Sequence, residues 1–305
     1  MEPDGVEVVR RFNRVVTQRI GALDEEYLAR GRPLGASRLL WEIGAGDDGG
    51  GADGEDAAEV RALRHRLELD SGYLSRLLRR LEADDLVTVD AGPGDGRRRE
   101  VRLTEAGRAE RAVLDERSDA LAWSVLDALD PPRRAELVAA MSTVVRLLTA
   151  GAVRVTVEDP ASAGAQVCMR SYFAELDARF HTGFDPARAL PVDADELVPP
   201  RGLLLVARLH GEPVGCGALK LHRDRIAEIK RLWVSPATRG LGVGRRLLRE
   251  LEQHAADRGA KRTRLDTNRT LTEAIALYRK DGYREVSPFN GEPYADHWFE
   301  KTLER

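Results

Sequence analysis

The residues with the most specific spacing form a glycine-rich loop that suits phosphate binding. In RLWVSPATRGLGVGRRLL, Arg239, Gly242 and Gly244 form an Arg-x-x-Gly-x-Gly pattern between a strand-like and a helix-like segment. Small residues let backbone N–H groups approach a phosphate, and the start of a helix adds free donors and a favourable dipole. A Walker loop needs Gly-Lys-Ser/Thr at its end, and a dinucleotide loop needs Gly or Ala where Leu247 stands. The spacing excludes both.

This region resembles the acetyl-CoA-binding part of the GNAT N-acetyltransferases. RLDTN at 264–268 and AIALYRKDGY at 274–283 follow the loop at that family's spacing, and the resemblance covers about 153–303. It implies acetyl-CoA as cofactor, held in a mixed sheet that splays at its centre, with a CoA-contacting asparagine and strand backbone that holds the pantetheine arm. The residues it assigns to CoA are Leu232, Val234, Arg239, Gly240, Leu241, Gly242, Val243, Gly244, Arg245 and Asn268.

Acetyl transfer to an amine needs a base for the amine and an acid for the departing thiolate. An alkyl amine with a pKa near ~10.4 is mostly protonated at pH 7, so a carboxylate must accept its proton, directly or through water. The resemblance makes Glu228 the candidate base, although a strand glutamate often only pairs with a neighbour such as Lys230 or Arg231. By the same resemblance Tyr278 is the candidate general acid, and the alternative is that it packs against the sheet.

The segment RSYFAELDARFHTGFDPARAL, at 170–190, lines the acceptor site in the resembled family. Its pattern predicts one helix followed by a loop. The acidic Glu175 and Asp177 would suit an amine, whereas Arg170 and Arg179 could hold a carboxylate. We therefore expect a small amine or an amino acid as the acceptor.

The first half carries a helix and a hairpin that suit DNA binding. The predicted helix from Ser71 to Asp84, with Asp70 or Ser71 as its N-cap, has four leucines on one side: Leu74, Leu77, Leu78 and Leu81. Its other sides carry Ser71, Tyr73, Ser75, Arg76 and Arg79. A helix that enters the major groove needs such short polar groups and arginines. LVTVD and RRREVRLT predict a hairpin, and an arginine at its tip can enter a narrow minor groove.

The order helix, turn, helix and hairpin is that of a winged helix-turn-helix, and it resembles the MarR transcription regulators over roughly 6–149. Asp95, Arg97, Leu103 and Thr104 keep that family's Asp-x-Arg-x5-Leu-Thr pattern, whereas Asp85 replaces its usual glycine. The resemblance implies that Arg97 reaches the minor groove of a double-stranded operator, braced by Asp95. It also implies a homodimer through the first and last helices of this half, whose apolar stripes could equally be intramolecular core. With 23 basic and 29 acidic residues, residues 1–150 predict modest, salt-sensitive binding.

The remaining periodicities divide the chain into two domains, 1–150 and 151–305. The first half predicts helices near 6–23, 34–43, 57–69, 71–84, 104–130 and 132–149. The second half mixes strands and helices around one βα unit. The fold class is therefore multi-domain: a mainly α winged helix-turn-helix, then an α/β (α+β) GNAT acyltransferase fold.

The composition of the 305 residues is that of an ordinary globular protein, with 42% hydrophobic residues and a net charge of −3. No apolar run reaches the ~20 residues of a membrane span, and no secretory signal is evident. The two cysteines, Cys168 and Cys216, favour a reducing cytoplasm, and the scattered histidines indicate no metal site. We expect a cytoplasmic transcription regulator that is also an N-acetyltransferase. The alternative is a regulator whose second domain senses acetyl-CoA, or another small ligand, without turnover.

Overall fold

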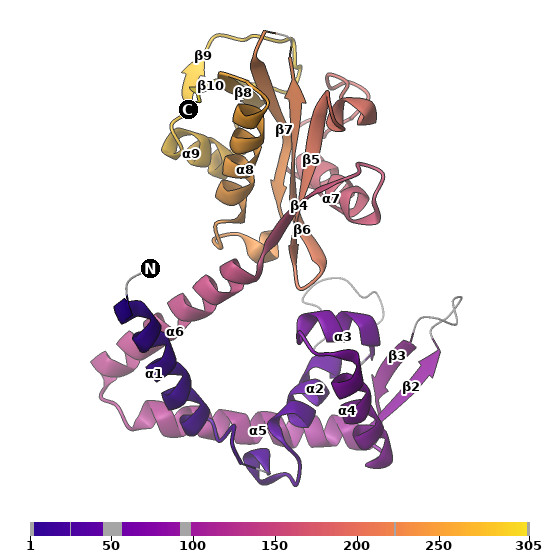
Figure 1. Cartoon of the computed structure of the whole chain (residues 1–305), viewed down its shortest axis with the longest axis vertical. Coiled ribbons are helices and arrows are strands. Elements are labelled where there is room, and N and C mark those ends of the chain that lie inside the picture. Colours follow the sequence, from indigo (N-terminus) through magenta and orange to yellow (C-terminus); the bar gives the residue numbers. More distant parts are fainter. Residues whose placement is uncertain (1–2, 25, 45–56, 92–98, 223, 304–305) are drawn as a thin grey trace. The chain divides into compact units, whose positions relative to one another are not determined.

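The computed structural model describes residues 3–24, 26–44, 57–91, 99–222 and 224–303 (Figure 1). The chain divides into two compact units, residues 1–141 and 142–305. This division falls inside a continuous helix, Pro131–Ala152, whereas the sequence pattern places a boundary at the end of that helix. The predicted boundary therefore stays a prediction.

The first unit is mostly helical, with one small sheet. Its elements are α1 (Pro3–Arg19), η1 (Tyr27–Ala29), α2 (Leu34–Gly44), β1 (Ala57–Glu59), α3 (Val60–Arg66), α4 (Ser71–Ala83), β2 (Val87–Ala91), β3 (Arg99–Leu103), α5 (Glu105–Asp127) and the start of α6 (Pro131–Ala152). The sheet has the order β1-β3-β2, and both of its pairings are antiparallel. The four predicted leucines of α4 are buried in a cluster with α2, α3 and the hairpin.

Side-chain caps fix where two of these helices begin. The Asp70 carboxylate accepts a hydrogen bond from the Tyr73 amide at 2.8 Å, and α4 starts directly after Asp70. Thr104 likewise accepts from the Gly107 amide at 2.9 Å and begins α5. The predicted helix at 57–69 is wrong in its first turn, because residues 57–59 form β1, paired with β3. The short Ala-Ala-Glu segment has no strong preference of its own, so the open edge of β3 decides its conformation.

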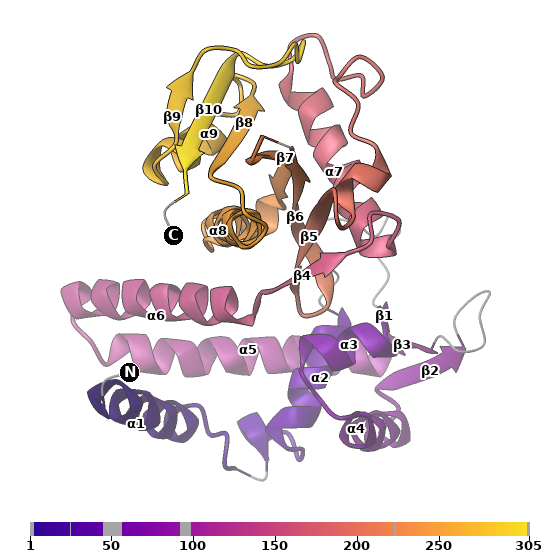
Figure 2. The same cartoon turned by 45° about the horizontal axis from the view of Figure 1, so that its top comes forward.

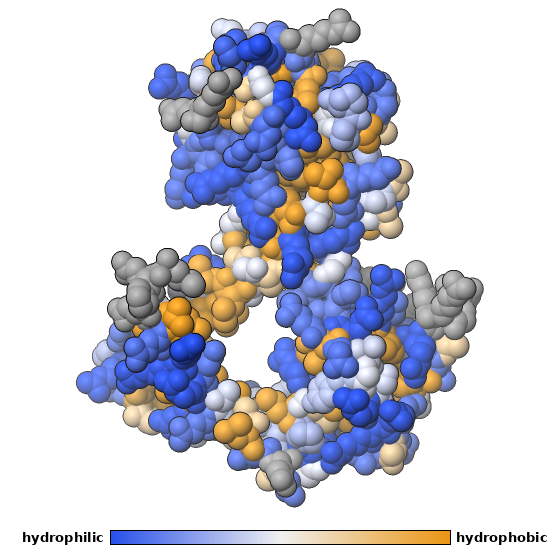
Figure 3. Space-filling view, viewed as in Figure 1, coloured by the Kyte–Doolittle hydropathy of each residue, from blue (hydrophilic) through white to orange (hydrophobic). Residues whose placement is uncertain are grey.

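The helices α1, α5 and α6 carry large apolar side chains that remain exposed. Val8 of α1 is 61% exposed, Trp123 of α5 is 55% exposed, and Leu148 of α6 is 67% exposed. Figure 3 shows apolar side chains along α6. By length and composition alone, α6 is the one described helix that could cross a membrane, which the sequence reasoning did not anticipate. Such a helix could equally be covered by a protein partner.

The second unit is built on a seven-stranded sheet with the order β4-β5-β6-β7-β8-β10-β9. Its elements are β4 (Arg154–Glu158), α7 (Ala163–Arg179), η2 (Ala194–Leu197), β5 (Gly202–Leu209), β6 (Glu212–Leu221), β7 (Ile226–Val234), η3 (Pro236–Thr238), α8 (Val243–Asp257), β8 (Arg262–Thr267), α9 (Thr272–Lys280), β9 (Arg284–Val286) and β10 (His297–Thr302). The pairing of β7 with β8 is parallel and every other described pairing is antiparallel. The predicted strands and helices are present, whereas the three-residue β9 was not predicted.

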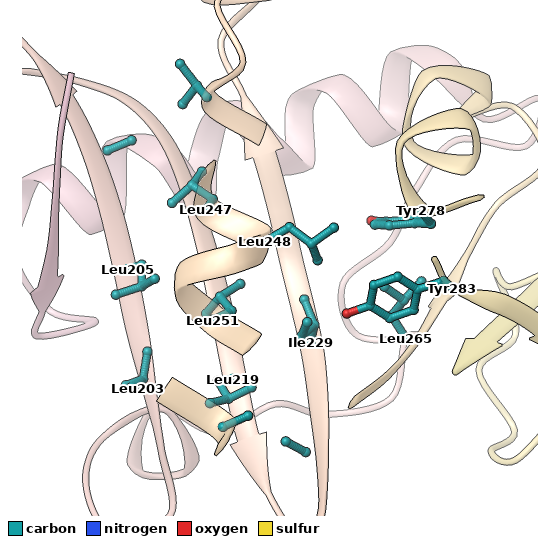
Figure 4. Close-up of a cluster of buried hydrophobic side chains, with 14 of the residues drawn as sticks. Leu203, Leu205, Leu219, Ile229, Leu247, Leu248, Leu251, Leu265, Tyr278 and Tyr283 are labelled. Atoms are coloured by element: carbon teal, nitrogen blue, oxygen red, sulfur yellow. The ribbon is translucent and has the colours of Figure 1, made fainter. Parts of the chain in front are cut away.

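Helices cover both faces of this sheet (Figures 1 and 2). Leu203 and Leu205 of β5 lie in the cluster that contains α8, whereas Leu204 and Val206 lie in the cluster that contains α7. The first of these clusters also holds Tyr278 and is shown in Figure 4. Because successive strand residues point to opposite faces, burial of both faces explains the unbroken apolar run GLLLVA.

Candidate active site

The site lies where the two parallel strands separate. β7 and β8 pair only at their first residues, 226–228 with 262–264, although β7 continues to Val234 and β8 to Thr267. A β-bulge also interrupts the pairing of β7 with β6, so that Arg231 and Leu232 together face Gly217. Such a bulge bends its strand and increases the local twist. The sheet is therefore splayed at its centre, as the sequence resemblance implied.

The glycine-rich loop follows β7 and leads into α8. Gly240 and Gly242 have φ angles of 81° and 82°, and Gly242 is the residue before the first turn of α8. These left-handed conformations favour glycine because a Cβ atom would strain them. An added Cβ at Gly244 would lie 3.5 Å from Leu277 and from Val234, which shows how closely α8 packs here. The first N–H groups of α8 lack partners inside the helix and are available to an anion.

The loop borders a cleft with a volume of about 640 Å³. Sites for small molecules and cofactors are commonly ~300–1,000 Å³. Eight of the ten residues predicted to bind the cofactor line this cleft: Leu232, Val234, Arg239, Gly240, Gly242, Val243, Gly244 and Arg245. Leu241 packs against the hydrophobic core instead, and Asn268 lines a second pocket. The Asn268 amide donates to the Tyr294 carbonyl at 2.7 Å, so it holds the chain around that pocket.

An ion-pair network fixes the arginine of the loop. The Arg239 guanidinium donates to Glu175 of α7 at 2.6 Å, and Glu175 also accepts from Trp233 at 2.9 Å and from Arg179 at 3.1 Å. Burial raises the pKa of Glu175, but these donors outweigh burial and hold the pKa below its usual range. Glu175 was expected on the acceptor side. It lies in the cleft of the glycine loop, where it orients Arg239.

A smaller pocket, of about 150 Å³, is lined by Ile229 to Leu232 of β7. Six aromatic side chains line it: Tyr172, Phe173, Phe180, Phe184, Tyr278 and Tyr294. The ring centroids of Phe184 and Tyr294 are 4.9 Å apart, and those of Phe173 and Phe184 are 5.6 Å apart. The residues that line both cavities are Tyr172, Leu176, Leu232, Leu271 and Ala274. The two cavities therefore meet beside β7. The segment 170–190 contributes side chains to both of them, and its role as the acceptor site stays a prediction.

Tyr278 lies on the wall of the smaller pocket, 5% exposed. Burial, together with the negative charge of Asp266, raises the pKa of its phenol above the usual value of 10.0. The phenol therefore stays protonated at neutral pH and can act as a proton donor. Figure 4 shows its ring beside that of Tyr283, so the alternative of packing against the sheet also describes its position.

Glu228 is buried at the closed end of the splay and lines neither of these two cavities. Its carboxylate lies 3.1 Å from the Lys230 ammonium and 3.0 Å from the His222 ring. Burial raises the pKa of Glu228, but Lys230 and His222 outweigh burial and hold it below its usual range. The pairing with Lys230 that the sequence left open is thus present, and catalysis by Glu228 stays a prediction.

Asp266 is a carboxylate that lines the smaller pocket, and sequence reasoning missed it. Its Oδ1 lies 2.5 Å from the Lys230 ammonium and 2.9 Å from the Asn290 amide nitrogen. Lys230 therefore links the carboxylates of Asp266 and Glu228. The sequence could have indicated Asp266, because side chains alternate along the predicted strand RLDTN and Asp266 therefore shares a face with Asn268. Among the described residues, no group of three or more His, Cys, Asp or Glu side chains is arranged to hold a metal.

The predicted DNA-contacting residues of α4 lie on its surface. Ser71, Arg76 and Arg79 are exposed, whereas Tyr73 and Ser75 are half-buried and Tyr73 packs against the leucine cluster. Asp95 and Arg97, the predicted pair at the hairpin tip, lie outside the described residues. Asp85 has a φ of 55°, which explains why glycine would suit this position.

The splayed sheet, the glycine loop before α8 and the two cavities that meet beside β7 define an acyl-CoA-dependent acyltransferase. A family model described as the acetyltransferase (GNAT) family matches residues 170–283. An IAA acetyltransferase of Azospirillum brasilense is 39% identical over 104 residues, 34% of this chain and 67% of that protein. The N-alpha-acetyltransferase RimI of Mycobacterium tuberculosis is 36% identical over 142 residues, 46% of this chain and 84% of that protein.

Among solved structures, an acetyltransferase of the GNAT family from Staphylococcus aureus Mu50 aligns over 50% of this chain and 100% of that one. The TM-score of this alignment is 0.44 and the sequence identity is 16%. The relatives establish that this chain belongs to the GNAT family of N-acetyltransferases, whose members use acetyl-CoA.

Proposed function

We propose that this protein joins a DNA-binding half to an acetyltransferase half that acetylates a small amine or an amino acid. The meeting of the two cavities beside β7 carries the enzymatic part of the proposal. A donor in the larger cleft and an acceptor in the aromatic pocket would come together there. Such proximity and orientation supply much of the rate of a two-substrate reaction.

The larger cleft offers groups that fit acetyl-CoA. The first N–H groups of α8 and the Arg239 guanidinium would hold the pyrophosphate, with Arg245 and Lys280 on the same cleft wall. The backbone of Leu232 and Val234, which the splay leaves unpaired toward β8, would hold the pantetheine arm as an added strand. Acetyl-CoA, when bound, supplies an activated acetyl thioester.

The proton transfers are assigned to Tyr278 and to the carboxylates around Lys230. Tyr278 holds a proton on its phenolic oxygen, which it would give to the departing thiolate. Because Glu228 lines neither cavity, it would take the amine proton only through water. Asp266 lines the acceptor pocket and offers a shorter route. The Lys230 ammonium lies within ion-pair distance of both carboxylates.

The test of the enzymatic part is thiol release by the full-length protein with acetyl-CoA and a panel of amines. The panel holds small aromatic and aliphatic amines, free amino acids and short peptides with free N-termini, because the relatives' names point to different acceptors. We expect thiol release above the rate without acceptor. If no amine gives it, and acetyl-CoA changes the affinity for DNA, the second unit is a ligand sensor instead.

The DNA-binding part of the proposal is supported by the exposed face of α4. We propose that this face reads an operator in double-stranded DNA, as in a MarR-type transcription regulator. Fluorescence anisotropy with a duplex library at increasing salt should show a log–log salt slope of about −0.9 for each phosphate that the protein neutralises. Arg76→Ala and Arg79→Ala should each make that slope shallower, and Arg133→Ala, on α6, should not. Equal slopes in all three variants would refute the assignment of α4.

The exposed apolar side chains of α1 and α6 support a homodimer formed through these helices. A second copy of the chain would cover both helices and remove their apolar surface from water. Sedimentation velocity should show a dimer that Leu148→Lys weakens. Leu23→Lys alters an equally apolar, 83% exposed residue between helices and should leave the dimer intact. A monomeric wild type would refute the proposal.

Two buried free thiols, Cys168 and Cys216, support a reducing, cytoplasmic location.

A further inference from the structure

Arg231 is a half-buried cation in the acceptor pocket that forms no ion pair with a described carboxylate. Its guanidinium donates to the Val192 carbonyl at 3.0 Å and lies 3.6 Å from the Met169 sulfur. The guanidinium carbon is 5.7 Å from the centroid of the Phe173 ring. Burial lowers the pKa of Arg231, and no carboxylate is among the groups that oppose this shift. A cation taken out of water in this way is costly unless an anion joins it.

The other charged groups of the pocket already have partners. Lys230 lies 2.5 Å from Asp266 and 3.1 Å from Glu228. The Glu292 carboxylate accepts a hydrogen bond from the Leu190 amide at 2.9 Å. Among the described residues that line this pocket, Arg231 is thus the cation without an anionic partner. A guanidinium has five N–H donors in a planar fork, which suits a carboxylate.

The backbone also holds Arg231 in a strained position. Its φ of 55° is left-handed, at the bulge where β7 turns away from its neighbour. A non-glycine residue in this conformation is unfavourable and persists only where the surrounding structure imposes it. The bulge lets Arg231 and Lys230 line the same pocket, although adjacent residues of a regular strand point to opposite faces.

The arginines that sequence reasoning offered for a carboxylate are placed elsewhere. Arg170 is exposed and lines neither cavity. Arg179 lies on the cleft of the glycine loop and pairs with Glu175 and Glu273. Arg231 therefore remains as the arginine of the acceptor pocket.

We propose that Arg231 binds the carboxylate of the acceptor, and that the acceptor is a free α-amino acid with an apolar side chain. This inference rests on the proposed acetyl transfer in this pocket. Leu232, the next residue, lines both cavities, so a carboxylate on Arg231 would hold the α-amine close to the thioester. The acceptor's side chain would contact the rings of Phe173, Phe184 and Tyr294. A protein N-terminus carries an amide in place of this carboxylate and is a different class of acceptor.

The test compares phenylalanine, in both enantiomers, with phenylalaninamide as acceptors of the full-length protein. The amide has the same shape and a less basic amine, so a preference for the acid must come from the carboxylate. We expect wild-type kcat/KM to favour the better enantiomer of the acid by about 100-fold. Arg231→Gln should reduce that ratio to within about threefold of one. Arg170→Gln should preserve it. A ratio near one in the wild type, or an unchanged ratio in Arg231→Gln, would overturn the inference.

A binding experiment separates this inference from the proposed acetyl transfer. Calorimetry with CoA present measures binding of N-acetylphenylalanine against N-acetylphenylalaninamide, with no turnover required. Preferential binding of the acid that Arg231→Gln abolishes supports the inference, even if no amine is acetylated and the enzymatic proposal fails. Acetylation of the amide with no preference for the acid overturns the inference and leaves the enzyme standing. If Arg231→Gln does not fold, Arg231→Lys keeps the charge without the fork and should reduce the ratio about tenfold.

Discussion

Replacement of Tyr278 by phenylalanine should separate catalysis from stability. The substitution removes one hydroxyl group and keeps the ring, whose centroid lies 5.9 Å from those of Tyr283 and Phe299. The Tyr278 hydroxyl makes no hydrogen bond within the described part of the chain, so the variant loses no partner in the folded protein. Its free energy of unfolding should change by less than about 0.5 kcal/mol.

The expected loss of activity follows from the role of the hydroxyl. A positioned general acid contributes about 10²–10⁴-fold in rate. At about 1.36 kcal/mol for each factor of ten, this raises the barrier by roughly 3–5 kcal/mol. Because burial keeps the pKa of Tyr278 above 10.0, the wild-type rate should show no loss from ionisation of this phenol up to that pH.

The assay is initial-rate thiol release at saturating acetyl-CoA and acceptor, with thermal unfolding of each variant. Tyr283→Phe is the matched control, because it removes the same hydroxyl group from a neighbouring buried tyrosine. The Tyr283 hydroxyl lies 3.0 Å from the hydroxyl of the buried Thr263. Loss of that bond should cost about 1–3 kcal/mol of stability and leave kcat unchanged below the unfolding temperature. If Tyr278→Phe keeps kcat within about threefold of the wild type, the assignment of Tyr278 as the acid is wrong.

Three further predictions concern stability. A Cβ at Gly107 would lie 1.9 Å from a backbone carbonyl oxygen, so Gly107→Ala should lower the unfolding free energy by about 1–3 kcal/mol in urea titrations. Gly151→Ala, also helical but with open space, should raise it by up to about 1 kcal/mol, and equal effects would contradict the packing argument. Asp85→Gly relieves a left-handed φ of 55° and should stabilise the first unit by about 1 kcal/mol, whereas destabilisation would exclude strain there. Burial raises the pKa of Tyr172 and Tyr283, so the folded chain keeps phenolic protons that the unfolded chain releases above about pH 10. The urea midpoint should therefore fall between about pH 9 and about pH 11, and a constant midpoint would refute these directions.

Local sequence patterns predicted most of the secondary structure, because apolar residues recur with the period of the helix or the strand that buries them. The stripe of four leucines in α4 and the cap at Asp70 placed that helix correctly. The glycine pattern placed the loop before α8, because left-handed φ angles leave a recognisable residue type. The strand β1 had no such signal, since its Ala-Ala-Glu sequence is ordered by the edge of β3. The DNA-reading function attached to this half remains a proposal.

The site was less predictable because its chemistry depends on contacts between distant segments. The sequence resemblance made Glu228 the candidate base. It did not show that Glu228 is buried against Lys230 and His222, because that burial depends on strand pairing. Asp266 comes to the pocket because β8 leaves β7 after three paired residues. Arg231 lines the same pocket as Lys230 because of a β-bulge in β7. The alternation of apolar and polar residues along EIKRLWV does not predict that bulge.

A crystal structure of the full-length protein with CoA and N-acetylphenylalanine would show directly where acetyl transfer takes place. We expect the CoA pyrophosphate at the start of α8 and the product among the aromatic rings of the smaller pocket. We also expect the thiol sulfur within about 4 Å of the Tyr278 hydroxyl, a distance that permits a hydrogen bond to sulfur. A thiol that points away from Tyr278, or a product bound outside the pocket, would contradict the claim that transfer takes place where the two cavities meet.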